Sequence, residues 1–220
     1  MWGVVFDTRL TFHDHISALA TSCFRRLGFV IRNLRCFQDP LAIKIVYNAL
    51  VRSKLETSSI VWNPYESIYA LLFEKVQKAF LRFLFKKVFG FYPYLYPTKY
   101  LLGSLGSLEV RRNFQLMITA CRALRGESDC PELVERLVRL FVSDVPRIAL
   151  RPRRRDLLAV PPARTVSYRN SPLPRALSQL NALLTSTPEC DLFAWRWAAI
   201  CSECLRLCEA MDARCSTVPI

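Results

Sequence analysis

Residues 50–64 read Leu-Val-Arg-Ser-Lys-Leu-Glu-Thr-Ser-Ser-Ile-Val-Trp-Asn-Pro, a stretch whose apolar residues alternate with polar ones and which ends at a proline. Proline suits the first position of a helix but not its interior, because it has no backbone N–H and its ring clashes with the preceding turn. We therefore interpret residues 50–64 as a joint between two helices, the second of which begins at Pro64.

The helix predicted after this joint, at residues 65–88, has two different faces. Its apolar residues have the three- and four-residue spacing of a buried stripe: Tyr69, Leu72, Val76, Phe80, Phe83 and Leu84. Four cations with the same kind of spacing share another face: Lys75, Lys78, Arg82 and Lys86. A merely solvated face usually mixes both signs of charge, so we expect this row to follow a phosphate backbone.

Another amphipathic helix is predicted from Asp14 to about residue 34. Its apolar side is opposed by a basic side that carries Arg25, Arg32 and Arg35, a second candidate nucleic-acid contact. The sequence around Asp14 is His-Asp-His, which resembles half of a metal site but has no third ligand at a suitable spacing. We expect Asp14 to cap the helix, with a histidine packed beside it, and we assign no metal ligand.

The joint is also preceded by a helix predicted at residues 40–53. Asp39 is a favourable N-cap residue, and Pro40 suits the first helical position. Near the N-terminus, residues 2–12 consist of two short β-prone pieces around Asp7-Thr8-Arg9, a pattern typical of a β-hairpin.

The chain after residue 88 alternates breaks and helices. Residues 89–106 form an aromatic connector whose tyrosines either stack on bases or pack over a core: Tyr92, Tyr94, Tyr96 and Tyr100. Helices are predicted at residues 107–125, 132–141, 173–184 and 190–211. The first of these ends before Gly126, where a C-cap glycine is expected. We expect Ser186 or Thr187, with Pro188, to cap the last of these. Residues 143–174 are rich in arginine and proline and predict an extended linker.

Composition favours an anionic partner. The 220 residues are 52% hydrophobic, enough for a substantial core, and carry a net charge of +13, which attracts nucleic acid first and acidic membrane second. No uncharged apolar run approaches the roughly 20 residues of a membrane span, and the N-terminal residues, with Asp7 and no basic segment before an apolar one, do not have the pattern expected of a signal peptide. We expect an intracellular protein, nuclear or cytoplasmic, that is soluble or peripheral.

Several kinds of catalytic site are disfavoured by the residues present. The chain has two histidines and six glycines, and it contains neither type of glycine-rich phosphate loop. No Asp-Asp pair occurs, and two-metal polymerase chemistry needs clustered carboxylates to hold magnesium. We therefore assign no catalytic residue and no cofactor.

The C-terminal cysteines have two interpretations. Four thiolates would complete a closed zinc site: Cys201, Cys204, Cys208 and Cys215. The three- and four-residue spacing of the first three equally indicates a buried helical stripe of small apolar groups. The stripe is favoured, because thiolates on one straight helix cannot surround a metal tetrahedrally.

A series of short motifs runs through most of the chain. In chain order they are Gly3-Val4-Val5-Phe6-Asp7, Leu10-Thr11-Phe12, His15-Ile16, Leu27-Gly28-Phe29-x-x-Arg32, Tyr47-Asn48, Leu50-Val51-Arg52, Leu55-Glu56, Val61-Trp62-x-Pro64, Glu74-x-Val76-Gln77, Leu105-x-Ser107-Leu108-Glu109-x-Arg111-Arg112, Asp129-Cys130-Pro131, Asn170-Ser171-Pro172 and Leu180-Asn181. The pieces are short, but their order and gaps resemble the region after the catalytic palm in reverse transcriptases of non-LTR retrotransposons of the jockey-like type.

This resemblance implies a mainly α-helical protein with a thumb-like helical bundle, a short N-terminal β-hairpin and a smaller helical C-terminal region. Residues 1–12 would end the palm as the primer-grip hairpin, and residues 13–126 would form the thumb. A short helix at 127–142, the linker at 143–174 and a helical C-terminal extension at 175–220 would follow. Arg111 and Arg112 join the expected nucleic-acid contacts, and the matching residues Leu55, Glu56, Trp62, Pro64 and Gln77 are expected to be structural.

The implied function is to grip the RNA/DNA template-primer duplex of an RNA-directed DNA polymerase, alongside the rest of a retrotransposon polyprotein. The fingers, the endonuclease and the palm carboxylates that hold Mg²⁺ in the parent enzyme have no counterpart here, so we expect no polymerase activity from this chain alone. The alternative is a helical protein-interaction or membrane-surface module with no nucleic-acid role. A third reading is a decayed fragment of a mobile element, without a selected function.

Overall fold

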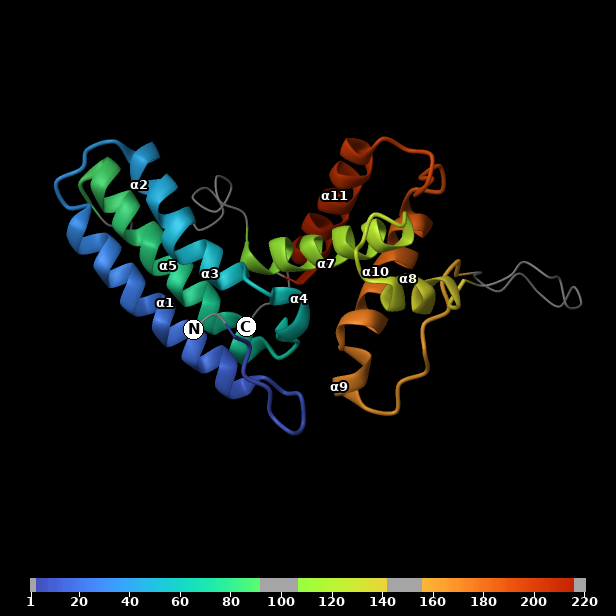
Figure 1. The fold of residues 1–220 in the computed structure, drawn as a ribbon. Helices are drawn as coiled ribbons and strands as arrows, with labels where there is room; N and C mark the ends of the chain where they lie inside the picture. The colour runs from blue at the N-terminus through green and yellow to red at the C-terminus, as the bar shows by residue number, and fades with distance from the viewer. Residues whose placement is uncertain (1–2, 92–106, 142–155, 216–220) are drawn as a thin grey trace, which may run out of the picture. The chain divides into compact units, whose positions relative to one another are not determined.

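The computed structural model describes residues 3–91, 107–141 and 156–215, and these are mainly α-helical, as the sequence predicts (Figure 1). The chain divides into two compact units, Met1–Arg112 and Asn113–Ile220, called here the N-terminal unit and the C-terminal unit. The division falls within a helix, whereas the sequence places the end of the thumb at residue 126; the sequence-based domain boundaries stay predictions.

The N-terminal unit is a bundle of three long helical segments. Its elements are α1 (His13–Asn33), α2 (Pro40–Tyr47), the π-helical turn η1 (Asn48–Arg52), α3 (Ser53–Glu56), α4 (Ser59–Trp62) and α5 (Ser67–Phe89), followed by the start of α7 (Leu108–Leu124). The segment α2–η1–α3 is continuous from Pro40 to Glu56 because Asn48, Arg52 and Ser53 all keep right-handed helical backbone angles. It therefore passes through the residue 53 at which the predicted helix ends.

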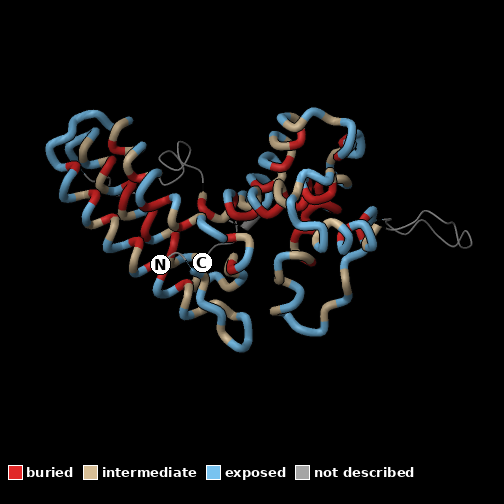
Figure 2. Tube along the Cα trace, viewed as in Figure 1, coloured by how far each residue is buried: buried red, intermediate tan, exposed pale blue. Residues whose placement is uncertain are grey.

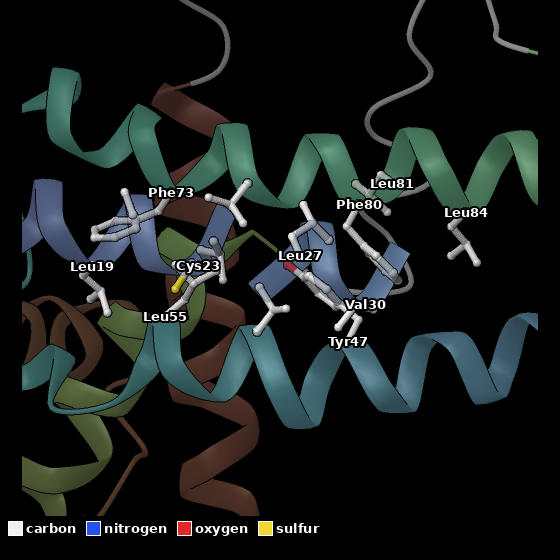
Figure 3. Packing of buried hydrophobic residues seen from close by; sticks show 14 of the residues in the cluster. Leu19, Cys23, Leu27, Val30, Tyr47, Leu55, Phe73, Phe80, Leu81 and Leu84 are labelled. Carbon is white, nitrogen blue, oxygen red and sulfur yellow. The ribbon is translucent and has the colours of Figure 1, made fainter. Parts of the chain in front are cut away.

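The core of the N-terminal unit lies between these three segments (Figure 3). The buried stripe of α1 includes Cys23 and Leu27, and the segment α2–η1–α3 contributes Tyr47 and Leu55. The ring of Tyr47 stacks on that of Phe80 of α5 with centroids 3.7 Å apart and an interplanar angle of 6°. Burial follows one side of each long helix, as an amphipathic pattern requires (Figure 2).

The N-terminal β-hairpin prediction is wrong, since residues 3–12 contain no strand in the part of the chain that the structure describes. The carboxylate of Asp7 instead accepts hydrogen bonds from the backbone N–H of Thr11 at 2.8 Å and of Phe12 at 2.9 Å. Leu10 and Phe12 also have left-handed backbone angles. The donors that a β-ladder would use are therefore engaged in a local Asp-centred turn.

Two predicted helix starts are also corrected. α5 begins at Ser67, so Pro64 lies three residues before the helix and only ends the preceding one, α4. α1 begins at His13 with Phe12 as its N-cap residue, so Asp14 lies in the first turn and does not cap the helix. By contrast, the Asp39 cap is confirmed, because its carboxylate accepts from the N–H of Leu41 at 2.9 Å and of Ala42 at 3.3 Å.

The C-terminal unit contains the rest of α7 with α8 (Pro131–Val138), α9 (Val166–Arg169), α10 (Pro172–Ser186) and α11 (Trp197–Cys215). α7 ends as predicted, with Gly126 in the left-handed conformation at φ 72°. The predicted cap of the last helix is wrong: α11 begins at Trp197, because residues 187–196 form turns in which Asp191 accepts from the N–H of Phe193 and Ala194.

Part of the predicted linker is ordered against α10. Leu158 is buried, and its backbone N–H and C=O both bond the amide of Asn181 of α10, at 3.1 and 2.8 Å. The short helix α9 also falls within the predicted linker. Residues 142–155 of the linker and residues 92–106 of the tyrosine-rich connector lie outside the described residues.

Candidate nucleic-acid interface

The basic row predicted on α5 is solvent-exposed over its whole length. The four side chains are Lys75, Lys78, Arg82 and Lys86. They lie opposite the buried stripe of the same helix, which includes Phe73, Val76 and Phe80. At 1.5 Å of rise per residue the row extends over about 16 Å, the axial distance of roughly five phosphates on one strand.

The acids of α5 are engaged away from this row. Glu74 accepts a hydrogen bond from the backbone N–H of Leu108 at 3.1 Å. Glu66, the N-cap residue of α5, pairs with the imidazole of His13 at 3.3 Å, and that ring stacks on Tyr69. The charged side chains exposed on the outward face of α5 are therefore positive, next to the exposed apolar side chains of Ile68 and Leu71.

The second predicted row is exposed too but lies on a different side of the bundle. Arg25 and Arg32 occupy the outward face of α1, and Arg35 follows the end of that helix. Because α1, α2 and α5 contact one another around one core, the outward faces of α1 and α5 diverge. The two rows therefore face different directions along α1 and α5, and they come near each other only where Arg35 lies beside the last turn of α5.

Sequence reasoning missed a connection between the ends of these helices. The ammonium group of Lys87 donates to the backbone carbonyl of Arg35, which fastens the last turn of α5 to the segment after α1. Lys87 is half-buried and lies off the exposed row. No pattern within either helix indicates this bond, since its partners are 52 positions apart.

Arg111 and Arg112 have structural partners within the N-terminal unit. Arg112 is 1% exposed; its Nε donates to Asn63 Oδ1 at 3.1 Å, and its guanidinium lies over the ring of Phe73 at 5.4 Å. This burial contradicts its expected role as a phosphate contact. The side chain of Arg111 is 45% exposed, and its guanidinium donates to both carboxylate oxygens of Glu56, at 2.5 and 3.0 Å.

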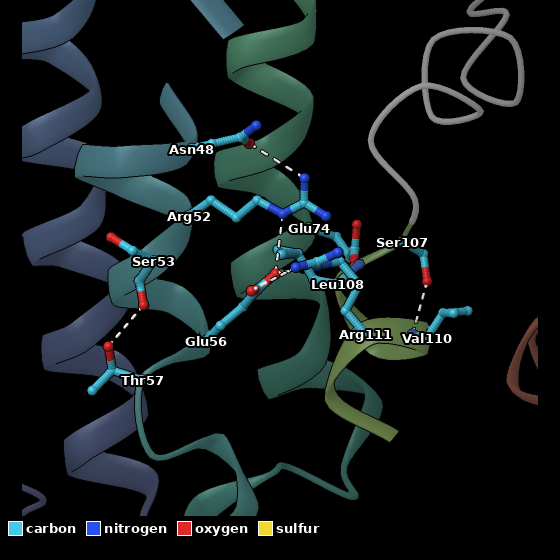
Figure 4. Close-up of polar contacts among 10 residues, drawn as sticks. All are labelled: Asn48, Arg52, Ser53, Glu56, Thr57, Glu74, Ser107, Leu108, Val110 and Arg111. Atoms are coloured by element: carbon cyan, nitrogen blue, oxygen red, sulfur yellow. Dashed lines mark hydrogen bonds and ion pairs between the residues drawn. The ribbon is translucent and has the colours of Figure 1, made fainter. Parts of the chain in front are cut away.

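Glu56 joins three parts of the unit (Figure 4). Besides Arg111 of α7, it accepts from Arg52 Nε at 3.0 Å, and Arg52 Nη1 donates to Asn48 at the start of η1. Burial by itself raises the pKa of Glu56, but the hydrogen bonds and charges of Arg111 and Arg52 outweigh it and lower the pKa. The carboxylate therefore stays ionised and holds α3, η1 and the start of α7 together.

The other predicted structural residues also belong to this core. Leu55 and Gln77 are fully buried, and Trp62 is 1% exposed with its indole N–H donating to the carbonyl of Thr57 at 3.1 Å. The Trp62 ring packs against that of Phe73 at 5.3 Å. Pro64 is half-buried in the turn that separates α4 from α5.

The C-terminal cysteines of α11 face a second helix. Cys208 lies 3.6 Å from the sulfur of Met117 of α7, and Cys204 bonds Cys121, also of α7. That hydrogen bond and burial raise the pKa of Cys204, and burial raises the pKa of Cys208 to about 12. These sulfurs are protonated core groups. Among the residues with described side chains, which exclude Cys215, no cluster of three or more metal-binding side chains is present.

No protein-family model, curated protein or solved structure matches this chain. Within the described ranges, no helix combines the length and apolar character needed to cross a membrane.

Proposed function

We propose that the chain is a nucleic-acid-gripping module, equivalent to the thumb and C-terminal part of a non-LTR retrotransposon reverse transcriptase, and that it holds an RNA/DNA template-primer duplex. The observation that supports the proposal most directly is the exposed basic row of α5, backed by a buried apolar stripe on the same helix. A cation row on a rigid helix contacts successive phosphates without reading bases, which is what holding a moving duplex requires.

The physical consequence is binding that depends strongly on salt. If all four cations of the α5 row neutralise a phosphate, the logarithm of the affinity falls with the logarithm of the salt concentration with a slope of about −3.6. Raising the salt from 50 to 200 mM then weakens binding about 150-fold. Binding that persisted at about 1 M salt, where the screening length is about 3 Å, would contradict a phosphate grip.

The test compares two charge-reversed variants with fluorescence anisotropy on an RNA/DNA hybrid. One carries K75E, K78E, R82E and K86E, and the other carries R136E, R164E, R169E and R196E, four exposed arginines of the C-terminal unit. Both variants have the same net charge, so general attraction to a polyanion falls equally. We expect the α5 variant to lose hybrid binding, and the control variant to show only the smaller loss that the change in net charge causes and to keep a steep salt dependence.

Equal losses in the two variants would assign binding to net charge and reject the α5 row as the grip. Circular dichroism melting of both variants excludes unfolding as the cause. In the parent enzymes Mg²⁺ is held by palm carboxylates that have no counterpart in this sequence, so nucleotide incorporation by this chain alone would also contradict the proposal.

The second candidate is a protein-interaction or membrane-surface module. It is favoured by the apolar outward face of α2, where Leu41 is 64% and Ile45 is 58% exposed. Co-sedimentation with acidic vesicles separates the two functions. The alternative predicts that L41S/I45S abolishes vesicle binding and leaves hybrid binding unchanged.

A further inference from the structure

A pocket of about 180 Å³ lies in the N-terminal unit, away from the outward face of α5. Its walls come from the segment before α1, from α1 itself, from α3 and from the link between α3 and α4. The lining residues that carry the argument are Val4, Val5, Leu19, His15, Ser22 and Lys54.

Lys54 gives the pocket a positive charge. Its ammonium group donates to the hydroxyl oxygen of Ser22 at 2.8 Å, across 32 positions of sequence. Because an ammonium has three donors and the Ser22 oxygen acts as acceptor here, both groups retain hydrogens to offer a ligand. No acidic residue lines the pocket, and no ion pair to Lys54 is present in the described part of the chain.

His15 adds a further donor. Its Nδ1 accepts a hydrogen bond from the backbone N–H of Val5 at 3.3 Å, so in the neutral ring the proton resides on Nε2. Partial burial lowers the pKa of His15, which favours this neutral form at pH 7. The ring is held against Trp62 with centroids 5.7 Å apart. In this tautomer Nε2 carries the hydrogen that His15, as a lining residue of the pocket, can donate.

The donors and the volume together define the ligand class. A cationic group with two neutral donors and no carboxylate selects an anion. The volume lies below the roughly 300–1,000 Å³ of pockets that enclose drug-sized molecules, so the pocket holds only a small group of a larger ligand. The apolar wall of Val4, Val5 and Leu19 suits a carbon-bearing group beside the charge.

We propose that this pocket binds the phosphate group of a phosphomonoester. Lys54 supplies the charge, and Ser22 and His15 supply hydrogen bonds to the phosphate oxygens. None of the residues of the α5 row lines this pocket, so phosphate binding here can be tested separately from duplex binding.

Isothermal titration calorimetry on the whole chain tests the proposal with AMP, adenosine and inorganic phosphate as probes. We expect AMP and phosphate to bind and adenosine not to bind. K54M should weaken AMP binding at least tenfold and S22A about threefold to tenfold. K78M, which removes one lysine from the α5 row instead, should have no effect.

Adenosine binding as tightly as AMP, or K54M binding AMP like the wild type, would overturn the proposal, as would equal losses in K54M and K78M. If K54M fails to fold, S22A decides the question, because it leaves Lys54 in place: unchanged AMP affinity in S22A overturns the site. The α5 charge-reversal variant should keep its AMP affinity, which separates a failure of this pocket from a failure of duplex binding.

A phosphomonoester has two sources, a free nucleotide or the 5′ end of a strand. A 5′-phosphorylated trinucleotide and its 5′-hydroxyl counterpart distinguish them. Tighter binding of the phosphorylated strand than of AMP assigns the pocket to strand ends. Preference for AMP assigns it to the free nucleotide. Equal binding of the two trinucleotides, together with no binding of AMP, rejects the proposal.

Discussion

At the scale of single residues, Glu56 is the most informative position. It was expected to be structural only through the resemblance, and it accepts bonds from two arginines on different elements. With its side chain 18% exposed, the pair is partly buried, so removing the charge should cost about 1–3 kcal/mol of unfolding free energy. We expect E56Q to lower the urea concentration at the unfolding midpoint at pH 7, because that midpoint falls in proportion to the unfolding free energy.

The stabilisation by Glu56 should depend on pH, because only its ionised form pairs with the arginines. The pKa of Glu56 is lower in the folded protein than its ordinary value of 4.5, so its stabilisation is present above that value. The stabilisation is lost as the pH falls through the folded-state pKa. Wild type should therefore lose more stability than E56Q between pH 7 and about pH 3.

The exposed pair Glu135–Arg139 provides a control, with side chains 65% and 75% exposed. E135Q should change the unfolding free energy by less than about 0.5 kcal/mol. If E56Q changes the unfolding free energy as little as E135Q does, or if the stability of E56Q depends on pH as that of wild type does, the Glu56 contacts do not stabilise the unit.

At the scale of elements, periodicity predicted the long helices well and predicted their ends less well. The apolar stripe of α1 is buried as expected, and that of α5 is buried at Val76, Phe80 and Leu84 and half-buried at its other predicted residues, because one face of a 3.6-residue repeat determines which residues meet a core. At residues 3–12 the error arose because a side chain engages the backbone locally: Asp7 closes a turn in place of a hairpin. After Pro64 the helix begins only at Ser67, and proline marks a break without fixing where the next helix starts.

Sequence reasoning found the basic row of the candidate interface but not the partners of other cations. The row on α5 follows from spacing within one helix. The burial of Arg112 against Asn63 and the contact of Lys54 with Ser22 join residues that are 49 and 32 positions apart. Such contacts depend on how helices pack, which the pattern of a single helix does not contain.

Two aspartates at helix starts provide a prediction at this scale. Asp39 bonds two backbone N–H groups of α2, whereas Asp14 lies inside the first turn of α1 and is no cap residue. D39A should therefore cost about 0.5–2 kcal/mol of unfolding free energy in a urea titration. D14A should cost less, since an acid in the first turn contributes about 0.3–1 kcal/mol through the helix dipole.

The substitution D39N serves as the matched control, because asparagine caps a helix about as well as aspartate. It should remain within a few tenths of a kcal/mol of wild type. A loss in D39N equal to that in D39A would assign the effect to the charge of Asp39 and not to its two capping bonds.

At the scale of the whole molecule, each unit has its own buried core. Phe80 is fully buried in the N-terminal unit, and Leu180 is fully buried in the C-terminal unit. Truncating either to alanine leaves a cavity and should cost about 2–5 kcal/mol. α7 runs through the division between the units, so it could couple the unfolding of one core to that of the other.

We expect two thermal transitions in differential scanning calorimetry, each following one core. F80A should lower the midpoint of one transition and L180A that of the other, while the remaining transition stays within a few degrees. Free energies of a few kcal/mol correspond to shifts of roughly 10 °C or more in units of this size. If both variants shift a single shared transition, α7 transmits unfolding between the cores, and the chain is one cooperative unit.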